Sequence, residues 1–213
     1  MRTRFEVLLV CTANVSRSPL AAALLRHHLI ERFGESAATV RVTSSGTRVP
    51  TGAGTDPDVA ELLRRLRRPA APAQVARQLE EEQVRAADLV VTMTREHRSH
   101  VIRAVPVAQR RTFTALELAR IARRLREGRR LPAGAPLAAG LRALVDAAPA
   151  WRGPTAPDDP AADDLVDVHG EPVEEQLRVA RRLDEALRVV VDCLPAPQRS
   201  SGTGSSSVEA TGW

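Results

Sequence analysis

The sequence predicts an α/β fold in which a three-layer, doubly wound, four-stranded parallel sheet carries helices on both faces. Apolar runs of strand length alternate with longer amphipathic segments, which is the pattern of βαβ units. The first run, Phe5–Val10, is almost wholly apolar, as expected of a strand that is buried on both faces of a parallel sheet. The 213 residues are enough for one core of ordinary domain size.

The first strand and helix follow each other closely. After Phe5–Val10 and a short loop, Ser18 is a suitable cap for a helix that has Pro19 at its first position and ends at Gly34. The same reasoning predicts further strands over 39–45, 88–93 and the short stretch 110–114, and further helices over 57–67, 95–105, 116–125, 137–147 and 172–194.

One domain and a tail are expected. Residues 1–194 hold all the predicted elements, and within them the stretch of about 127–163 is rich in Ala, Pro and Gly. We interpret this stretch as an insertion that lies over one edge of the sheet around the helix 137–147. Residues 195–213 have no apolar periodicity and are expected to be disordered.

Composition excludes several classes of protein. The two cysteines are far apart, which rules out a disulfide framework and indicates a reduced, cytoplasmic setting. No apolar run approaches the ~18 residues of a membrane span, so we expect a soluble protein without a membrane partner. The net charge is +5, but the arginines are interleaved with acids and aromatic residues are few, which argues against nucleic acid as a partner.

The loop after the first strand has the pattern Cys-x5-Arg, from Cys11 to Arg17. Ligands of open α/β sheets bind at the carboxyl ends of strands, where backbone N–H groups and a helix N-terminus attract anions. A thiol in such surroundings favours its nucleophilic thiolate form. The Arg17 guanidinium offers two parallel donors for two phosphoryl oxygens, so the loop predicts covalent phosphoryl transfer.

The motifs "VCTANVSRSP", "TSSGT", "ARQL" and "ADLVVTMTREHR" resemble the low-molecular-weight protein tyrosine phosphatases, in particular the bacterial branch of phosphatases and arsenate reductases. The resemblance covers most of residues 4–126 and, less closely, 163–193. It implies the strand order of flavodoxin-like folds and hydrolysis of phosphotyrosine in proteins through a phosphocysteine intermediate. It also implies that no cofactor is needed and that phosphate-like oxyanions inhibit.

The resemblance implies roles for each residue of the Cys11–Ser18 loop. Cys11 would be the nucleophile and Arg17 the group that binds phosphate and the transition state. Asn14 would hold the loop conformation, and Ser18 would donate its hydroxyl hydrogen to the thiolate. Backbone N–H groups for phosphate would come from Thr12, Ala13, Val15 and Ser16.

The family also uses an aspartate, usually followed by proline, as general acid shortly before the last helix. We expect Asp167, which lies five residues before Pro172 although Val168 stands in place of the proline. The alternative is Asp159, which keeps the Asp-Pro dipeptide further upstream, and the remaining possibility is that neither serves. His169 stands where relatives often carry an aromatic residue, so it is a candidate for lining the pocket.

Two other functions stay open. The first is arsenate reduction with an external small thiol, since Ser16 is not a cysteine and Cys193 lies in the final helix. The second is a non-catalytic, phosphate-binding regulatory module, suggested by Val168 and the insertion. We expect no metal site, because the remaining histidines lie on predicted helices without converging cysteine or carboxylate partners; these are His27, His28, His97 and His100.

Overall fold

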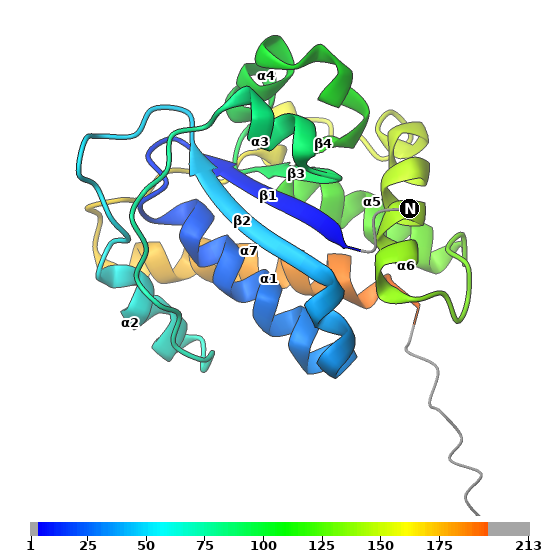
Figure 1. Cartoon of the computed structure of the whole chain (residues 1–213), viewed down its shortest axis with the longest axis horizontal. Coiled ribbons are helices and arrows are strands. Elements are labelled where there is room, and N and C mark those ends of the chain that lie inside the picture. Colours follow the sequence, from blue (N-terminus) through cyan, green and yellow to red (C-terminus); the bar gives the residue numbers. More distant parts are fainter. Residues whose placement is uncertain (1–3, 196–213) are drawn as a thin grey trace, which may run out of the picture.

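The computed structural model of this chain describes residues 4–195, which form a four-stranded parallel sheet in the order β2-β1-β3-β4 (Figure 1). This architecture confirms the predicted α/β fold. Cys11, the last residue of β1, pairs with Gly46 of β2, and the preceding Val10 pairs with Thr92 of β3. The strands are β1 (Phe5–Cys11), β2 (Val40–Gly46), β3 (Leu89–Thr92) and β4 (Thr112–Thr114).

Helices cover both faces of the sheet (Figure 1). One face carries α1 (Arg17–Phe33), α5 (Ala115–Glu127) and α7 (Val173–Asp192), and the other carries α3 (Glu81–Ala86) and α4 (Arg95–Ala104), while α2 (Asp58–Arg65) packs against α1 and α7. Alternate residues of β1 enter two different clusters: Leu9 lies in the larger core with α1 and α7, and Leu8 lies in the smaller one with α4. Burial on both sides explains why this run is almost wholly apolar.

The first helix begins earlier than the sequence predicts. It starts at Arg17, and Ser18 is its second residue rather than its cap. The hydroxyl of Ser18 is engaged with Cys11 and Asn14 instead, so it is not available to the end of the helix. The helix predicted over 57–67 also ends sooner, because Arg67 takes a positive φ of 56°.

Residues 74–86 contain structure that the sequence analysis did not predict. Gln78 pairs with Gly46 at the end of β2, and Val75 pairs with Gly54 in the loop that follows. The short helix α3 comes next, opened by a capping box at Glu80. These contacts place the segment beside the carboxyl end of β2.

The predicted helix at 137–147 is present as α6 (Leu137–Ala147), but this helix lies at the amino ends of the strands rather than over an edge of the sheet. α6 contacts the 3₁₀ turns that precede β2 and β4. The Arg142 guanidinium lies 5.7 Å from the centre of the Phe5 ring at the start of β1. α6 therefore covers the amino ends of the strands, opposite the Cys11–Ser18 loop (Figure 1). The later part of the stretch reaches the edge strand β4, where Arg152 NH2 donates to the Thr112 carbonyl at 2.6 Å. Of the tail predicted over 195–213, only residue 195 is described, and residues 196–213 lie outside the described part of the chain.

None of the helices within residues 4–195 combines the length and apolar character that crossing a membrane requires.

Candidate active site

The loop between β1 and α1 is held in place by Asn14, whose backbone has a positive φ of 56° and whose side chain is fully buried. Asparagine adopts this left-handed conformation more readily than most residues. Its Nδ2 group donates to Ser18 Oγ and to Ser44 Oγ, each at 2.9 Å, and its Oδ1 atom accepts from the Arg77 N–H at 2.9 Å. The side chain thus links the loop to β2 and to the segment before α3.

Cys11 and Ser18 face each other inside this loop. The Cys11 Sγ atom lies 3.0 Å from Ser18 Oγ, and both side chains are buried. Because Ser18 Oγ already accepts from Asn14, its own hydrogen can point at the sulfur, which lies closer than the Ser45 carbonyl at 3.5 Å. A hydroxyl in this position stabilises a thiolate.

The end of β2 supports the loop from the side, and it does so at Gly46. The Thr47 and Arg48 N–H groups donate to the carbonyls of Cys11 and Thr12, each at 2.9 Å. A Cβ atom on Gly46 would lie 2.5 Å from the Thr12 carbonyl oxygen, which is well inside contact distance. Glycine is therefore required for this close approach of two backbones.

Arg17 is the first residue of α1, and its guanidinium lies beside Thr12 at the mouth of the loop, which is the open side of Cys11–Ser18. Its NH1 group donates to the Leu165 carbonyl at 3.1 Å, and its NH2 group donates to Thr12 Oγ1 at 3.2 Å and forms an ion pair with Asp167. The residue is only 8% exposed. The Leu165 N–H donates in turn to the Met93 carbonyl at 2.8 Å, so the segment that carries Asp167 is fixed to the end of β3.

Two of the three acid-loop candidates lie at the mouth. Asp167 contacts Arg17, and His169 Nδ1 lies 2.8 Å from Asp56 Oδ2 in the loop before α2. Asp159 instead accepts the Ala161 N–H at 2.9 Å and caps a 3₁₀ turn. Val168 packs partly buried against the core and so helps to anchor the loop.

His97 belongs to the site, although sequence reasoning gave it no role. Its Nε2 atom lies 3.0 Å from Thr12 Oγ1 and its Nδ1 atom 2.8 Å from Thr94 Oγ1. Burial, reinforced by the nearby Arg17 guanidinium, lowers the pKa of His97 to about 4, so the ring is neutral at pH 7. The neutral ring can accept from the Thr12 hydroxyl, which leaves the Thr12 oxygen free to accept from Arg17. The sequence feature that contains His97 is the motif "TMTREHR", which is part of the family resemblance.

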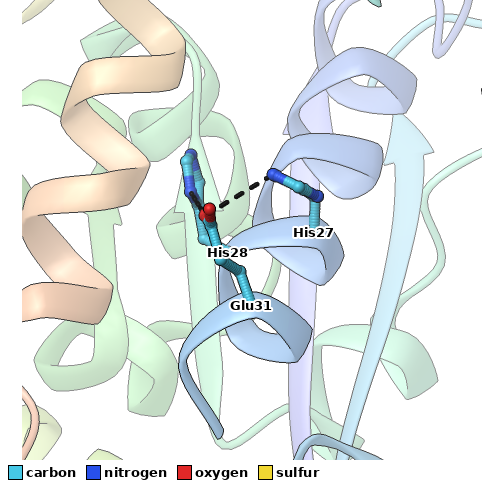
Figure 2. A group of neighbouring side chains, drawn as sticks. All are labelled: His27, His28 and Glu31. Atoms are coloured by element: carbon cyan, nitrogen blue, oxygen red, sulfur yellow. Dashed lines mark ion pairs between the residues drawn. The ribbon is translucent and has the colours of Figure 1, made fainter. Parts of the chain in front are cut away.

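His27 and His28 do converge with carboxylates, contrary to expectation. Figure 2 shows Glu31 Oε2 between them, 3.5 Å from His27 Nε2 and 3.8 Å from His28 Nδ1. However, the Arg68 guanidinium lies 3.0 Å from His27 Nε2, and Asp184 pairs with both His28 and Arg68 at 2.8 Å. The positively charged Arg68 guanidinium beside His27 Nε2 repels a divalent cation. The group acts as an ion-pair network between α1 and α7.

Cys193 lies just after α7, far from the loop. Burial raises the pKa of its thiol to about 12, and its Sγ atom contacts the Val190 carbonyl. The neighbouring Leu194 carbonyl accepts from Arg32 at the far end of α1, and a 17-residue helix is about 25 Å long. Cys193 therefore cannot form a disulfide with Cys11 in the folded protein.

Comparison with known proteins identifies phosphatases that are similar to this chain. The family model of low molecular weight phosphotyrosine protein phosphatases matches residues 6–124. A protein-arginine-phosphatase of Bacillus subtilis (strain 168) is 31% identical over 112 residues, which cover 53% of this chain and 71% of the relative. The low molecular weight protein-tyrosine-phosphatase Ptp of Acinetobacter johnsonii is 26% identical over 108 residues, covering 51% and 70%.

Solved structures extend the similarity to the fold of nearly the whole described chain. A low molecular weight protein tyrosine phosphatase from T. tengcongensis superposes with a TM-score of 0.63 at 20% sequence identity. The match covers 89% of this chain and 99% of that one.

Proposed function

Because the chain belongs to the low molecular weight phosphotyrosine protein phosphatase family, we propose that it removes phosphoryl groups from protein side chains through a covalent intermediate on Cys11. One observation carries the proposal. The Cys11 sulfur, the Ser18 hydroxyl and the Arg17 guanidinium converge on a single loop at the carboxyl end of β1. Both cysteines are free thiols, which suits the reducing conditions of the cytoplasm.

In the first step, the Cys11 thiolate attacks phosphorus while the bond from phosphorus to the leaving group breaks. The backbone N–H groups of the loop and the forked donors of Arg17 stabilise the charge on the phosphoryl oxygens. Asp167, in its protonated form, gives its proton to the leaving atom. The products are a phosphocysteine, the dephosphorylated side chain and the Asp167 carboxylate.

In the second step, water attacks the phosphocysteine. The Asp167 carboxylate takes one proton from this water, the phosphorus–sulfur bond breaks, and inorganic phosphate leaves. The Cys11 thiolate and protonated Asp167 are regenerated. Ser18 stabilises the departing thiolate, because its hydroxyl lies at 3.0 Å from the sulfur.

Phosphotyrosine is the first candidate substrate, as the family's description suggests. Its phenol ring would pack against the imidazole of His169 at the mouth. Among the described residues, the phenylalanines are buried in the core or against it, and Trp151 lies beside Arg124. In the loop that carries Asp167, His169 is therefore the side chain whose ring would contact the phenol ring of the substrate.

Phosphoarginine is the second candidate, and two observations favour it. The relative from Bacillus subtilis is named a protein-arginine-phosphatase. In addition, the Asp56 carboxylate lies beside His169 at the mouth, where it would attract a guanidinium group. Both candidates use the same cysteine chemistry.

The test compares hydrolysis of phosphotyrosine and phosphoarginine peptides by the wild-type protein and by Cys11→Ser. We expect the variant to lose turnover but to keep binding phosphate, because the loop and Arg17 remain. Substantial hydrolysis by Cys11→Ser would overturn the mechanism. Arsenate-dependent oxidation of an external thiol, without peptide hydrolysis, would favour the reductase, and phosphate binding without either activity would favour the regulatory module.

A further inference from the structure

A second pocket, of about 310 Å³, lies directly beside the Cys11–Ser18 loop. Thr12 and His97 line it, and the Thr12 hydroxyl contacts Arg17 of the active site, so the pocket adjoins that site. The pocket has room for about ten water molecules, which is enough for an acidic side chain. The other walls come from the loop after β2 and from α4, and they include Thr47, Arg48, Glu96, His100 and Arg103.

The charges in this pocket favour an anion. Arg48 enters from the β2 side, and its backbone N–H is fixed to the Thr12 carbonyl at 2.9 Å. Arg103 enters from the opposite wall, on the same face of α4 as Glu96. Within residues 4–195, neither Arg48 nor Arg103 makes an ion pair, whereas Arg95 at the start of α4 is paired with Asp164 at 2.9 Å. Two guanidinium groups thus face one carboxylate.

We propose that this pocket binds an acidic side chain of the protein substrate, a Glu or Asp that lies near the phosphorylated residue in sequence. The inference rests on the proposed phosphatase function and adds a determinant of substrate choice to it. An extended peptide advances about 3.3 Å per residue, so close neighbours of the phosphorylated residue can reach across Thr12. The carboxylate would receive charge-assisted hydrogen bonds from Arg48 and Arg103.

The experiment measures a ratio, the kcat/KM for an acidic phosphopeptide divided by that for its alanine counterpart. A phosphotyrosine peptide with alanine neighbours is compared with versions that carry one glutamate at each neighbouring position in turn. We expect at least one acidic peptide to be preferred about three- to tenfold by the wild type, since two partly exposed charge pairs contribute modestly. Added salt should reduce the preference.

Four variants identify the pocket. Arg48→Gln and Arg103→Gln should each lower the ratio, and together they should bring it to about one, while Glu96→Gln should raise it because a repulsive charge is removed. The matched control is Arg110→Gln, which removes the same charge at the amino end of the sheet, in a cavity lined also by Phe5. This control should keep the wild-type ratio. A ratio that ignores Arg48 and Arg103, or that falls equally in the control, would overturn the proposal.

Binding of the same peptides to Cys11→Ser separates this inference from the proposed function. If the wild type hydrolysed neither these peptides nor phosphoarginine peptides, the proposed function would fail, and the ratio of dissociation constants would still test the pocket. If hydrolysis occurred with no preference for acidic peptides, only the pocket would be refuted.

Discussion

Arg17 makes its contacts in two directions, because the guanidinium group is planar and forked. One NH group bonds to the Leu165 carbonyl, while the other reaches Thr12 and Asp167. A lysine could keep the positive charge at this position, but it could not make these parallel contacts or bind two phosphoryl oxygens side by side.

We therefore expect Arg17→Lys to lose most activity, with kcat/KM reduced by 10²-fold or more, roughly the effect of losing one transition-state hydrogen-bond donor. Steady-state kinetics with an aryl phosphate would measure the loss, and a circular dichroism spectrum would check the fold. Wild-type kinetics in this variant would show that Arg17 has a purely structural role.

The two aspartate candidates differ in their contacts, and this difference makes a second prediction. Asp167→Asn should lower the rate by roughly 10²–10⁴-fold, as for a lost general acid. The loss should be larger for poor leaving groups, such as alkyl phosphates, than for a nitrophenyl phosphate. Asp159→Asn is the matched control, because Asp159 caps a turn. The assignment would be reversed if the control showed the leaving-group dependence and Asp167→Asn did not.

Some residues of the site follow from the sequence more directly than others. Cys11 and Arg17 lie within one short stretch, so their spacing alone brings them together, whereas the roles of Asn14 and Ser18 followed from the family resemblance. His97 was missed because its role depends on the packing of α4 against the end of β1, which spacing along the chain does not reveal.

At the scale of elements, the loop depends on the strand beside it. β1 and α1 were predictable from local patterns, apart from the first turn of α1, where Ser18 contacts Cys11. The support from β2 and from Gln78 is tertiary, since Gly46 pairs with both Cys11 and Gln78. The six-residue helix α3 is too short to show a periodicity, and the sequence therefore did not reveal it.

Gly46→Ala tests this support. The added methyl group would meet the Thr12 carbonyl and force the loop to move, at a cost of about 1–3 kcal/mol in the free energy of unfolding. We expect a folded protein with strongly reduced kcat. Gly153→Ala is the control, because a Cβ atom there meets nothing within 4 Å. Equal effects of the two substitutions, measured by denaturant unfolding and by kinetics, would contradict this account of Gly46.

At the scale of the whole molecule, distant contacts hold the helices of one face together. Asp184 on α7 pairs with His28 on α1 and with Arg68 after α2. Burial alone would raise the pKa of Asp184, but hydrogen bonds from His28 and Arg68 outweigh it and the pKa is lowered. Its contribution to stability is therefore present above the ordinary aspartate pKa and is lost in stronger acid, as the pH falls through the lowered value.

His97 makes the folding stability depend on pH in a milder range. Its pKa is about 4 in the folded protein against 6.5 for an ordinary histidine, so the unfolded chain binds a proton between these values and the folded protein does not. The free energy of unfolding should fall by roughly 3 kcal/mol from pH 7 to pH 4 through this residue. Denaturant titrations should show a smaller decrease for His97→Gln. An identical decrease in both proteins would exclude His97 as the source.

In its ion pair with Arg17, the Asp167 carboxylate occupies the guanidinium group that would otherwise bind phosphate. The carboxylate therefore competes with phosphate for Arg17. Inorganic phosphate must displace the Asp167 carboxylate from the guanidinium, so part of its binding free energy is spent on that exchange. Asp167→Asn should therefore bind phosphate about two- to fivefold more tightly, a modest gain because the carboxylate is half exposed. The same substitution that slows turnover would strengthen product inhibition, which calorimetric titration with phosphate can measure. Weaker phosphate binding by the variant would show that Asp167 assists the anion instead of competing with it.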